Sequence, residues 1–97
     1  MKNQIEAVIR LHKKDNPIMS YHLEERFNLA GSEIRNIIRE LRRQGKPIAN
    51  CPSGYYWAET YPEIEPTIND LEGRAFSMLE TSKALKNTFK ENQLTIF

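Results

Sequence analysis

Apolar residues recur three or four positions apart in three segments of the first half of the chain, the spacing of helices that bury one face. The residues at this spacing are Ile5, Val8 and Ile9 in the first segment, Leu23 and Phe27 in the second, and Ile34, Ile37, Ile38 and Leu41 in the third. The pattern predicts helices over about 3–14 and 21–27, the second with Ser20 as its N-cap. It predicts a third helix that Ser32 caps and Gly45 ends.

Two short segments after the third helix have the composition of β-strands. Residues 47–50 and 55–58 are separated by Cys51-Pro52-Ser53-Gly54, whose proline and glycine are typical of a hairpin turn. Because side chains alternate along a strand, Tyr56 or its two aromatic neighbours must face the core. We therefore expect these aromatic residues to be mostly buried, with one exposed.

The composition changes again beyond the hairpin. Residues 59–66 contain two prolines and three acidic residues, which predicts a linker. A fourth helix then extends over residues 67–89, with Thr67 as its cap, and a flexible tail follows at 90–97. The apolar residues of this helix are Leu71, Ala75, Met78, Leu79, Leu85 and Phe89. The sequence leaves open whether this stripe packs on the first helix or forms a homodimer with a second copy.

Together these elements predict a mainly α fold with a small β-hairpin, in which residues 1–58 form the one folded domain of a 97-residue chain. The net charge of +1 hides an asymmetry within that chain. Residues 1–58 carry ten Lys and Arg against six Asp and Glu, whereas residues 59–97 carry four against seven. The excess of positive charge in the first part favours a nucleic-acid partner for that part.

Several classes of function lack support in the composition. A single cysteine, Cys51, permits no internal disulfide or cysteine-based zinc site, and two histidines without neighbouring ligands indicate no metal site. No serine or cysteine nucleophile stands in a recognisable setting, so we expect neither an enzyme nor a cofactor. No apolar run has membrane-spanning length and no signal-peptide core is visible, so we expect a cytoplasmic protein.

The predicted order of helix, short strand, helix, turn, helix and two-stranded wing resembles the winged helix-turn-helix of phage and mobile-element DNA-binding proteins. The segments that carry this resemblance are 17–18, 27–35, 39–48 and 53–57. The resemblance covers about residues 3–58 and implies that the third helix enters the major groove of DNA. The alternative is a winged helix that binds protein, with its arginines on an ordinary solvated face.

The resemblance implies a role for each polar residue of the third helix and the wing. The residues placed to reach base edges are Ser32, Glu33, Arg35 and Asn36, with Arg35 suited to guanine and Asn36 to adenine. The residues placed to hold phosphates are Arg39, Arg42, Arg43 and Lys46, to which Lys13 and Lys14 add. Ser53, at the wing tip, is expected on the DNA backbone or in the minor groove, although residues 50–54 contain no Lys or Arg.

The last five residues of the sequence resemble a second known motif. They read Gln93-Leu94-Thr95-Ile96-Phe97. This is similar to the pentapeptide Gln-Leu-Ser/Asp-Leu-Phe, by which bacterial replication and repair proteins bind the DNA polymerase sliding clamp. The resemblance implies that Leu94, Ile96 and Phe97 enter a hydrophobic pocket while the Gln93 amide makes hydrogen bonds at its edge. The alternative is that Ile96 and Phe97 fold back onto the domain or close a homodimer.

We therefore expect a DNA-binding accessory protein in the replication of a phage or mobile genetic element, with a winged helix on DNA and a tail on the sliding clamp. One alternative is a dimeric winged-helix transcriptional regulator whose tail is structural. Another is an adaptor for a replicative polymerase, primase or helicase that binds protein or single-stranded DNA. Sequence-specific, salt-dependent binding of duplex DNA favours the regulator, and weak non-specific binding favours the accessory protein.

Overall fold

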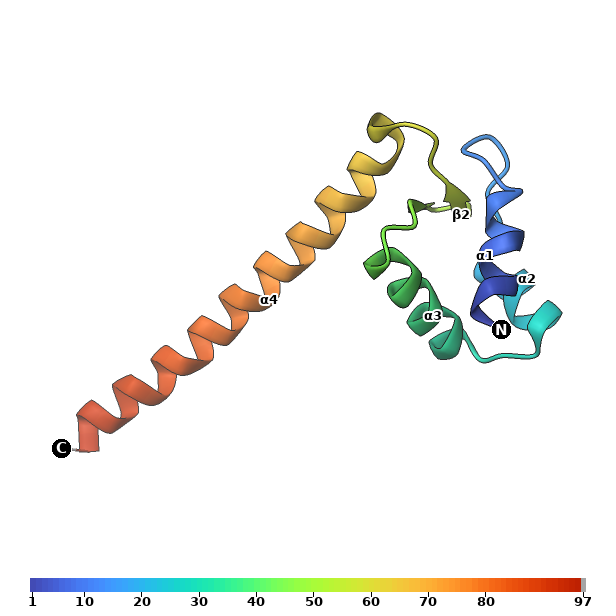
Figure 1. Ribbon diagram of the computed structural model, residues 1–97. Helices are drawn as coiled ribbons and strands as arrows, with labels where there is room; N and C mark the ends of the chain where they lie inside the picture. Colours follow the sequence, from blue (N-terminus) through green and yellow to red (C-terminus); the bar gives the residue numbers. More distant parts are fainter. Residues whose placement is uncertain (97) are drawn as a thin grey trace. The chain divides into compact units, whose positions relative to one another are not determined.

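A computed structural model of the chain describes the backbone of residues 1–96 and the side chains of residues 1–90 (Figure 1). The elements are α1 (Lys2–Arg10), α2 (Ser20–Phe27), α3 (Gly31–Arg43), β1 (Ile48–Cys51), β2 (Gly54–Trp57) and α4 (Tyr61–Ile96). The fold is mainly helical with a small antiparallel hairpin, as predicted. The chain divides into two compact units, Met1–Thr67 and Ile68–Phe97. The side chains of the predicted clamp-binding residues Gln93, Leu94, Ile96 and Phe97 lie outside the described residues.

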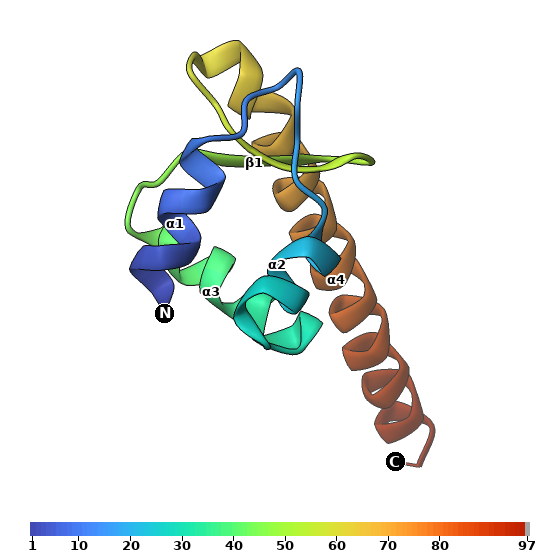
Figure 2. The same cartoon turned by 90° about the vertical axis from the view of Figure 1, so that its right-hand side faces the viewer.

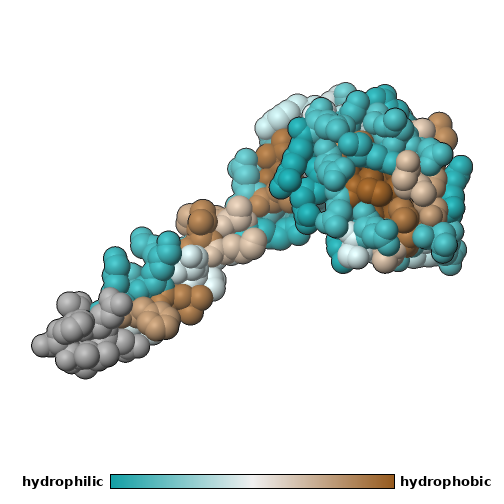
Figure 3. Space-filling view, turned by 60° about the horizontal axis from the view of Figure 1, so that its bottom comes forward, coloured by the Kyte–Doolittle hydropathy of each residue, from teal (hydrophilic) through white to brown (hydrophobic). Residues whose placement is uncertain are grey.

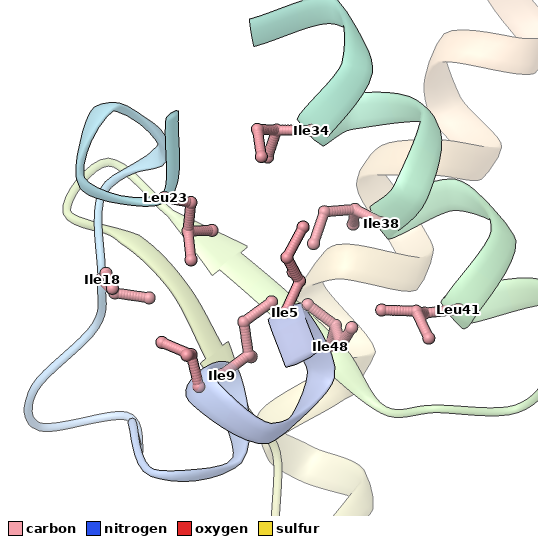
Figure 4. Packing of buried hydrophobic residues seen from close by; sticks show 9 residues of the cluster. Ile5, Ile9, Ile18, Leu23, Ile34, Ile38, Leu41 and Ile48 are labelled. Atoms are coloured by element: carbon pink, nitrogen blue, oxygen red, sulfur yellow. The ribbon is translucent and has the colours of Figure 1, made fainter. Parts of the chain in front are cut away.

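The first unit is built around one hydrophobic core enclosed by α1, α2, α3 and the hairpin. The buried residues of this core are Ile5, Val8, Ile9, Ile18, Leu23, Ile34, Ile38, Leu41 and Ile48. Figure 4 shows the side chains of α1 and α3 pointing toward one another, with Ile18 and Leu23 beside them. All but two of these residues were identified from the helical spacing of apolar positions, so the predicted buried faces of the three helices are confirmed.

The hairpin lies across one end of the three helices (Figure 2). Its strands pair antiparallel, with Ile48 opposite Trp57. Ile18 extends the sheet, since its amide donates to the Tyr55 carbonyl and its carbonyl accepts the Tyr55 amide, both at 2.8 Å. Gly54 makes this approach possible because a Cβ atom there would lie 2.2 Å from the Ile18 carbonyl oxygen, and its φ of +128° disfavours other residues.

The three aromatic residues of β2 divide between the two faces of the hairpin. Tyr56 is buried in a second cluster with Ala49 and Ala58, while Tyr55 and Trp57 pack half-buried against the main core. The alternation expected of a strand is therefore present. The expectation of one exposed aromatic residue is wrong, because both residues on the core side are partly covered.

The predicted linker at 59–66 is wrong from residue 61 onward, since α4 begins at Tyr61. Pro62 lies in the first helical turn, where an amide proton has no partner within the helix and its absence costs little. Pro66 lies inside the helix and removes one hydrogen bond of the helical ladder. Prolines that suggested a break are thus accommodated within the start of α4.

Contacts with the hairpin stabilise this first part of α4. Ile64 packs against the second cluster, and the Tyr56 hydroxyl donates to the Glu63 carbonyl at 3.1 Å. Thr67 is only 4% exposed, and its hydroxyl oxygen accepts the Asn50 amide at 3.1 Å. These contacts offset the bond lost at the internal proline and extend the first unit to Thr67, beyond the predicted boundary at residue 58.

Helix ends differ from the predictions by a few residues. Ser20 and Ser32 are helical residues instead of N-caps, and α3 is capped by the carboxylate of Glu33, which accepts the Ala30 amide at 3.2 Å. Gly45 has the predicted left-handed conformation, with φ of +86°. The helix α1 ends at residue 10 rather than near 14, and α4 continues to residue 96 rather than ending at 89.

No helix in the described part of the chain combines the length and the hydrophobicity that crossing a membrane requires.

Candidate nucleic-acid interface

The predicted DNA-binding residues of α3 are exposed because its apolar residues fix its rotation. At 1.5 Å per residue the helix is about 20 Å long, enough to occupy a stretch of major groove. Ile34, Ile38 and Leu41 are at most 2% exposed. The predicted residues of α3 that are exposed are Ser32, Glu33, Arg35, Asn36, Arg39 and Arg43. At about 100° per residue, these six positions span about 160° of the circumference of the helix, with Arg35 at one edge and Glu33 at the other.

Asn36 and Arg39 form a polar pair on this face. The Arg39 guanidinium donates to the Asn36 side-chain oxygen at 2.9 Å, and both side chains are exposed. An asparagine that reads adenine uses its oxygen and its amide together, so Arg39 has to release that oxygen before Asn36 can do so. While the pair is intact, Asn36 can still donate from its amide, and Arg39 keeps its remaining donors for a phosphate.

Glu33 has a structural task rather than a place on the basic face. Its carboxylate accepts the Ala30 amide and so satisfies one of the free amides at the start of α3. Glu40, on the same flank of the helix, lies 3.6 Å from the Lys2 ammonium. The two carboxylates of α3 therefore stand to one side of the arginines and do not neutralise them.

Arg42 joins α3 to the hairpin. Its guanidinium donates to the Ile48 carbonyl at 2.8 Å and to the Asn50 side-chain oxygen at 3.0 Å. The residue was predicted as a phosphate contact, but the structure places it half-buried within the first unit. A signal was present in the sequence: Arg42 follows Ile38 by four residues, which puts it at the edge of the buried face.

Lys46 belongs to a small charge cluster on α1. Its ammonium lies 3.6 Å from the Glu6 carboxylate, which also accepts the Arg10 guanidinium at 2.9 Å. The hydrogen bond from Arg10 lowers the pKa of Glu6 below its ordinary value of 4.5; desolvation opposes this effect, and the charge of Lys46 adds to it. A phosphate at Lys46 therefore has to compete with Glu6.

The same Arg10 covers the only tryptophan of the chain. Its guanidinium carbon lies 4.1 Å from the centre of the Trp57 ring, and the Trp57 amide donates to the His12 carbonyl at 2.8 Å. The ring is thus half-buried and held by a cation–π contact. This arrangement leaves Trp57 poorly placed to stack on a single-stranded base.

Lys13 and Lys14 line a shallow hollow together with Asp15, Glu59 and Glu63. Three carboxylates beside two ammonium groups make this hollow acidic on balance. The structure therefore gives the two lysines neighbours that weaken the phosphate contacts predicted for them.

The tip of the hairpin offers little charge. Ser53 is exposed in the two-residue turn, as its predicted DNA contact requires. Asn50 makes its hydrogen bonds within the fold, because its backbone amide donates to Thr67 and its side-chain oxygen accepts a hydrogen bond from Arg42. The hairpin thus provides a polar hydroxyl at its tip, and the basic residues lie on α3.

The exposed cations of the candidate interface are concentrated on α3. Arg35 and Arg43 make no ion pair with any residue whose side chain is described. Among the same residues, no group of histidine, cysteine and acidic side chains could hold a metal ion. No protein-family model, curated protein or solved structure matches the chain.

Proposed function

We propose that the first unit is a winged helix-turn-helix that binds duplex DNA with α3 in the major groove. The observation that carries the proposal is the division of α3 into a buried apolar side and an exposed side with Arg35, Arg39 and Arg43. Cations held on one face of a rigid helix attract phosphates and release counterions when they bind. Arg35 and Asn36, in the first turns, are then nearest the base edges, and Arg39 and Arg43 hold the DNA backbone.

The proposed role is that of a DNA-binding accessory protein in the replication of a phage or mobile genetic element. This part of the proposal depends on the resemblance of residues 93–97 to clamp-binding pentapeptides. A peptide that enters a groove in extended form has to leave the helical conformation, and α4 runs to Ile96. Clamp binding therefore includes unwinding the last turn of α4 as one of its steps.

The DNA proposal is tested by anisotropy titrations of a labelled duplex at several salt concentrations. The variant Arg39→Ala/Arg43→Ala should bind more weakly to every duplex, and the slope of log K against log salt should fall by about 1.8, near 0.9 per phosphate contact. The matched control Arg26→Ala/Lys83→Ala removes the same charge from other exposed positions. Equal slopes for the two variants contradict the assigned face.

The clamp proposal is tested with purified bacterial clamp and the full chain, with and without residues 93–97. Removal of these residues should abolish a micromolar-range affinity, about 8 kcal/mol, while duplex binding is retained. Clamp binding that survives the deletion contradicts the assigned motif. Loss of duplex binding in the same variant contradicts the division of roles between the first unit and the tail.

A dimeric transcriptional regulator is the second candidate function. The observation that favours it is the exposed apolar side of α4, which an isolated DNA-binding monomer does not need. Binding that discriminates strongly between duplex sequences supports the regulator over the accessory protein. The adaptor that binds single-stranded DNA has less support, because Tyr55, Tyr56 and Trp57 are all at least partly buried.

A further inference from the structure

The second unit is a helix with large apolar side chains in solvent. The large apolar residues of α4 that are exposed here are Leu71, Phe76, Met78, Leu79, Leu85 and Phe89, most of them by more than 60% (Figure 3). A lone helix in water is marginal even with good helix formers, and Gly73 weakens this one by about 1 kcal/mol relative to alanine. A partner that buries these side chains would supply the missing stability.

The apolar residues of α4 repeat with the spacing of a coiled coil. Alternating steps of three and four residues connect Ile68, Leu71, Ala75, Met78, Ser82, Leu85 and Phe89. In heptad notation the a positions hold Ile68, Ala75, Ser82 and Phe89, and the d positions hold Leu71, Met78 and Leu85. Three consecutive heptads of this kind define a seam that winds into a left-handed coil.

We propose that α4 pairs antiparallel with α4 of a second copy of this chain. In an antiparallel pair each a residue faces a d residue, and one register matches large residues with small ones. It places Leu71 opposite Phe89, Ala75 opposite Leu85 and Met78 opposite Ser82. In the parallel arrangement Ala75 faces Ala75 of the second copy, and Ser82 faces Ser82. The side chains of these two layers are too small to fill the space between the helices.

Charge favours the same orientation. At the edge of an antiparallel seam the e positions of the two helices meet. Glu72 of one copy then lies beside Lys86 of the other, and the two copies of Leu79 lie beside each other. The parallel arrangement brings g and e positions together, where Arg74 meets Leu79 and Thr81 meets Lys86, so no opposite charges pair. The antiparallel register therefore covers every exposed apolar side chain described above except Phe76, which lies off the seam.

This inference does not rest on the proposed function, and its first test is the mass of the full chain in sedimentation equilibrium. The expected mass is twice the 11.4 kDa of one chain. Met78→Glu, on the seam, should give the monomer mass, whereas the matched control Phe76→Glu should leave the dimer intact. The fluorescence of Trp57 reports separately that the first unit stays folded. A monomeric wild-type chain, or equal loss of the dimer in both variants, overturns the proposal.

Cysteine cross-linking tests the orientation in a Cys51→Ser background. In the antiparallel register the two copies of Ala75 lie ten residues apart along the axis, about 15 Å, beyond the reach of a disulfide. Ala75→Cys alone should therefore stay unlinked under oxidation, whereas Ala75→Cys/Leu85→Cys should give a covalent dimer. Linking of the single variant indicates a parallel pair and overturns the proposed orientation, as does failure of the double variant to link.

Discussion

Replacing Arg42 by alanine should destabilise the first unit, whereas the same change at the exposed Arg43 should have little effect on its stability. The Arg42 guanidinium donates to the Ile48 carbonyl at 2.8 Å and to Asn50 at 3.0 Å. Ile48 itself is fully buried. Alanine at position 42 therefore leaves a carbonyl at the edge of the core without its charged donor and separates the end of α3 from β1.

The expected loss of unfolding free energy follows from these contacts. A partly buried acceptor that loses a charged donor costs about 1–3 kcal/mol. For a unit of this size each kcal/mol lowers the melting temperature by about 4–8 °C. Arg43→Ala removes an exposed side chain with no partner among the described residues, so its cost should stay within about 0.5 kcal/mol.

The assay is urea unfolding followed by the fluorescence of Trp57, the only tryptophan of the chain, which lies on β2 of the same unit. Arg42→Lys is the matched control for charge, because lysine keeps the positive charge but cannot donate to both acceptors with one planar group. Arg42→Lys should lose much of the unfolding free energy that the Arg42 contacts contribute, while retaining most of the affinity for DNA. If Arg42→Ala is as stable as the wild type and weakens DNA binding as Arg43→Ala does, the structural role assigned to Arg42 is wrong.

Three further predictions use the same unfolding assay. Ile38→Ala should cost about 2–5 kcal/mol, since Ile38 is 2% exposed within the core; a negligible loss would mean that α3 is rotated. Gly54→Ala should cost at least about 1–3 kcal/mol, because its Cβ would meet the Ile18 carbonyl oxygen, and unchanged stability would contradict this close approach. The pKa of Glu6 is lowered in the folded state, so the ionised carboxylate stabilises the fold above pH 4.5. This contribution is lost as the pH falls through the pKa of the folded state. Glu6→Gln should flatten the stability profile below pH 4.5, and an unaltered profile would refute the ion cluster.

The buried helical faces could be predicted from the sequence because their cause is local. A helix that packs on a core needs apolar residues at fixed spacing, and Ile34, Ile38 and Leu41 meet that need without reference to the rest of the chain. The hairpin could be predicted for a similar reason, since Pro52 in its turn and Gly54 at the start of β2 interrupt two strand-like segments.

The features that were missed depend on contacts between distant residues. Two prolines predicted a linker at 59–66, whereas the hydrogen bond between Asn50 and Thr67 favours a helix there. The local sequence does not predict that hydrogen bond, because it joins residues far apart in the chain. The spacing from Ile38 puts Arg42 at the edge of the buried face, but its hydrogen bonds to Ile48 and Asn50 depend on the position of β1. The sequence therefore predicts which side of α3 is exposed. The structure was needed to show which polar residues make contacts within the fold and which are left for a ligand.

The length of α4 has a consequence for the separation of the two ends of the proposed pair. With Leu71 opposite Phe89, the two copies of Ile68 lie 24 residues apart along the pair, about 36 Å at 1.5 Å per residue. Ile68 is the first residue of the second unit, so this length separates the points at which the two first units join the paired helices. Deleting one heptad from the middle of α4 shortens this separation by about 10 Å, so the number of heptads in α4 sets its value.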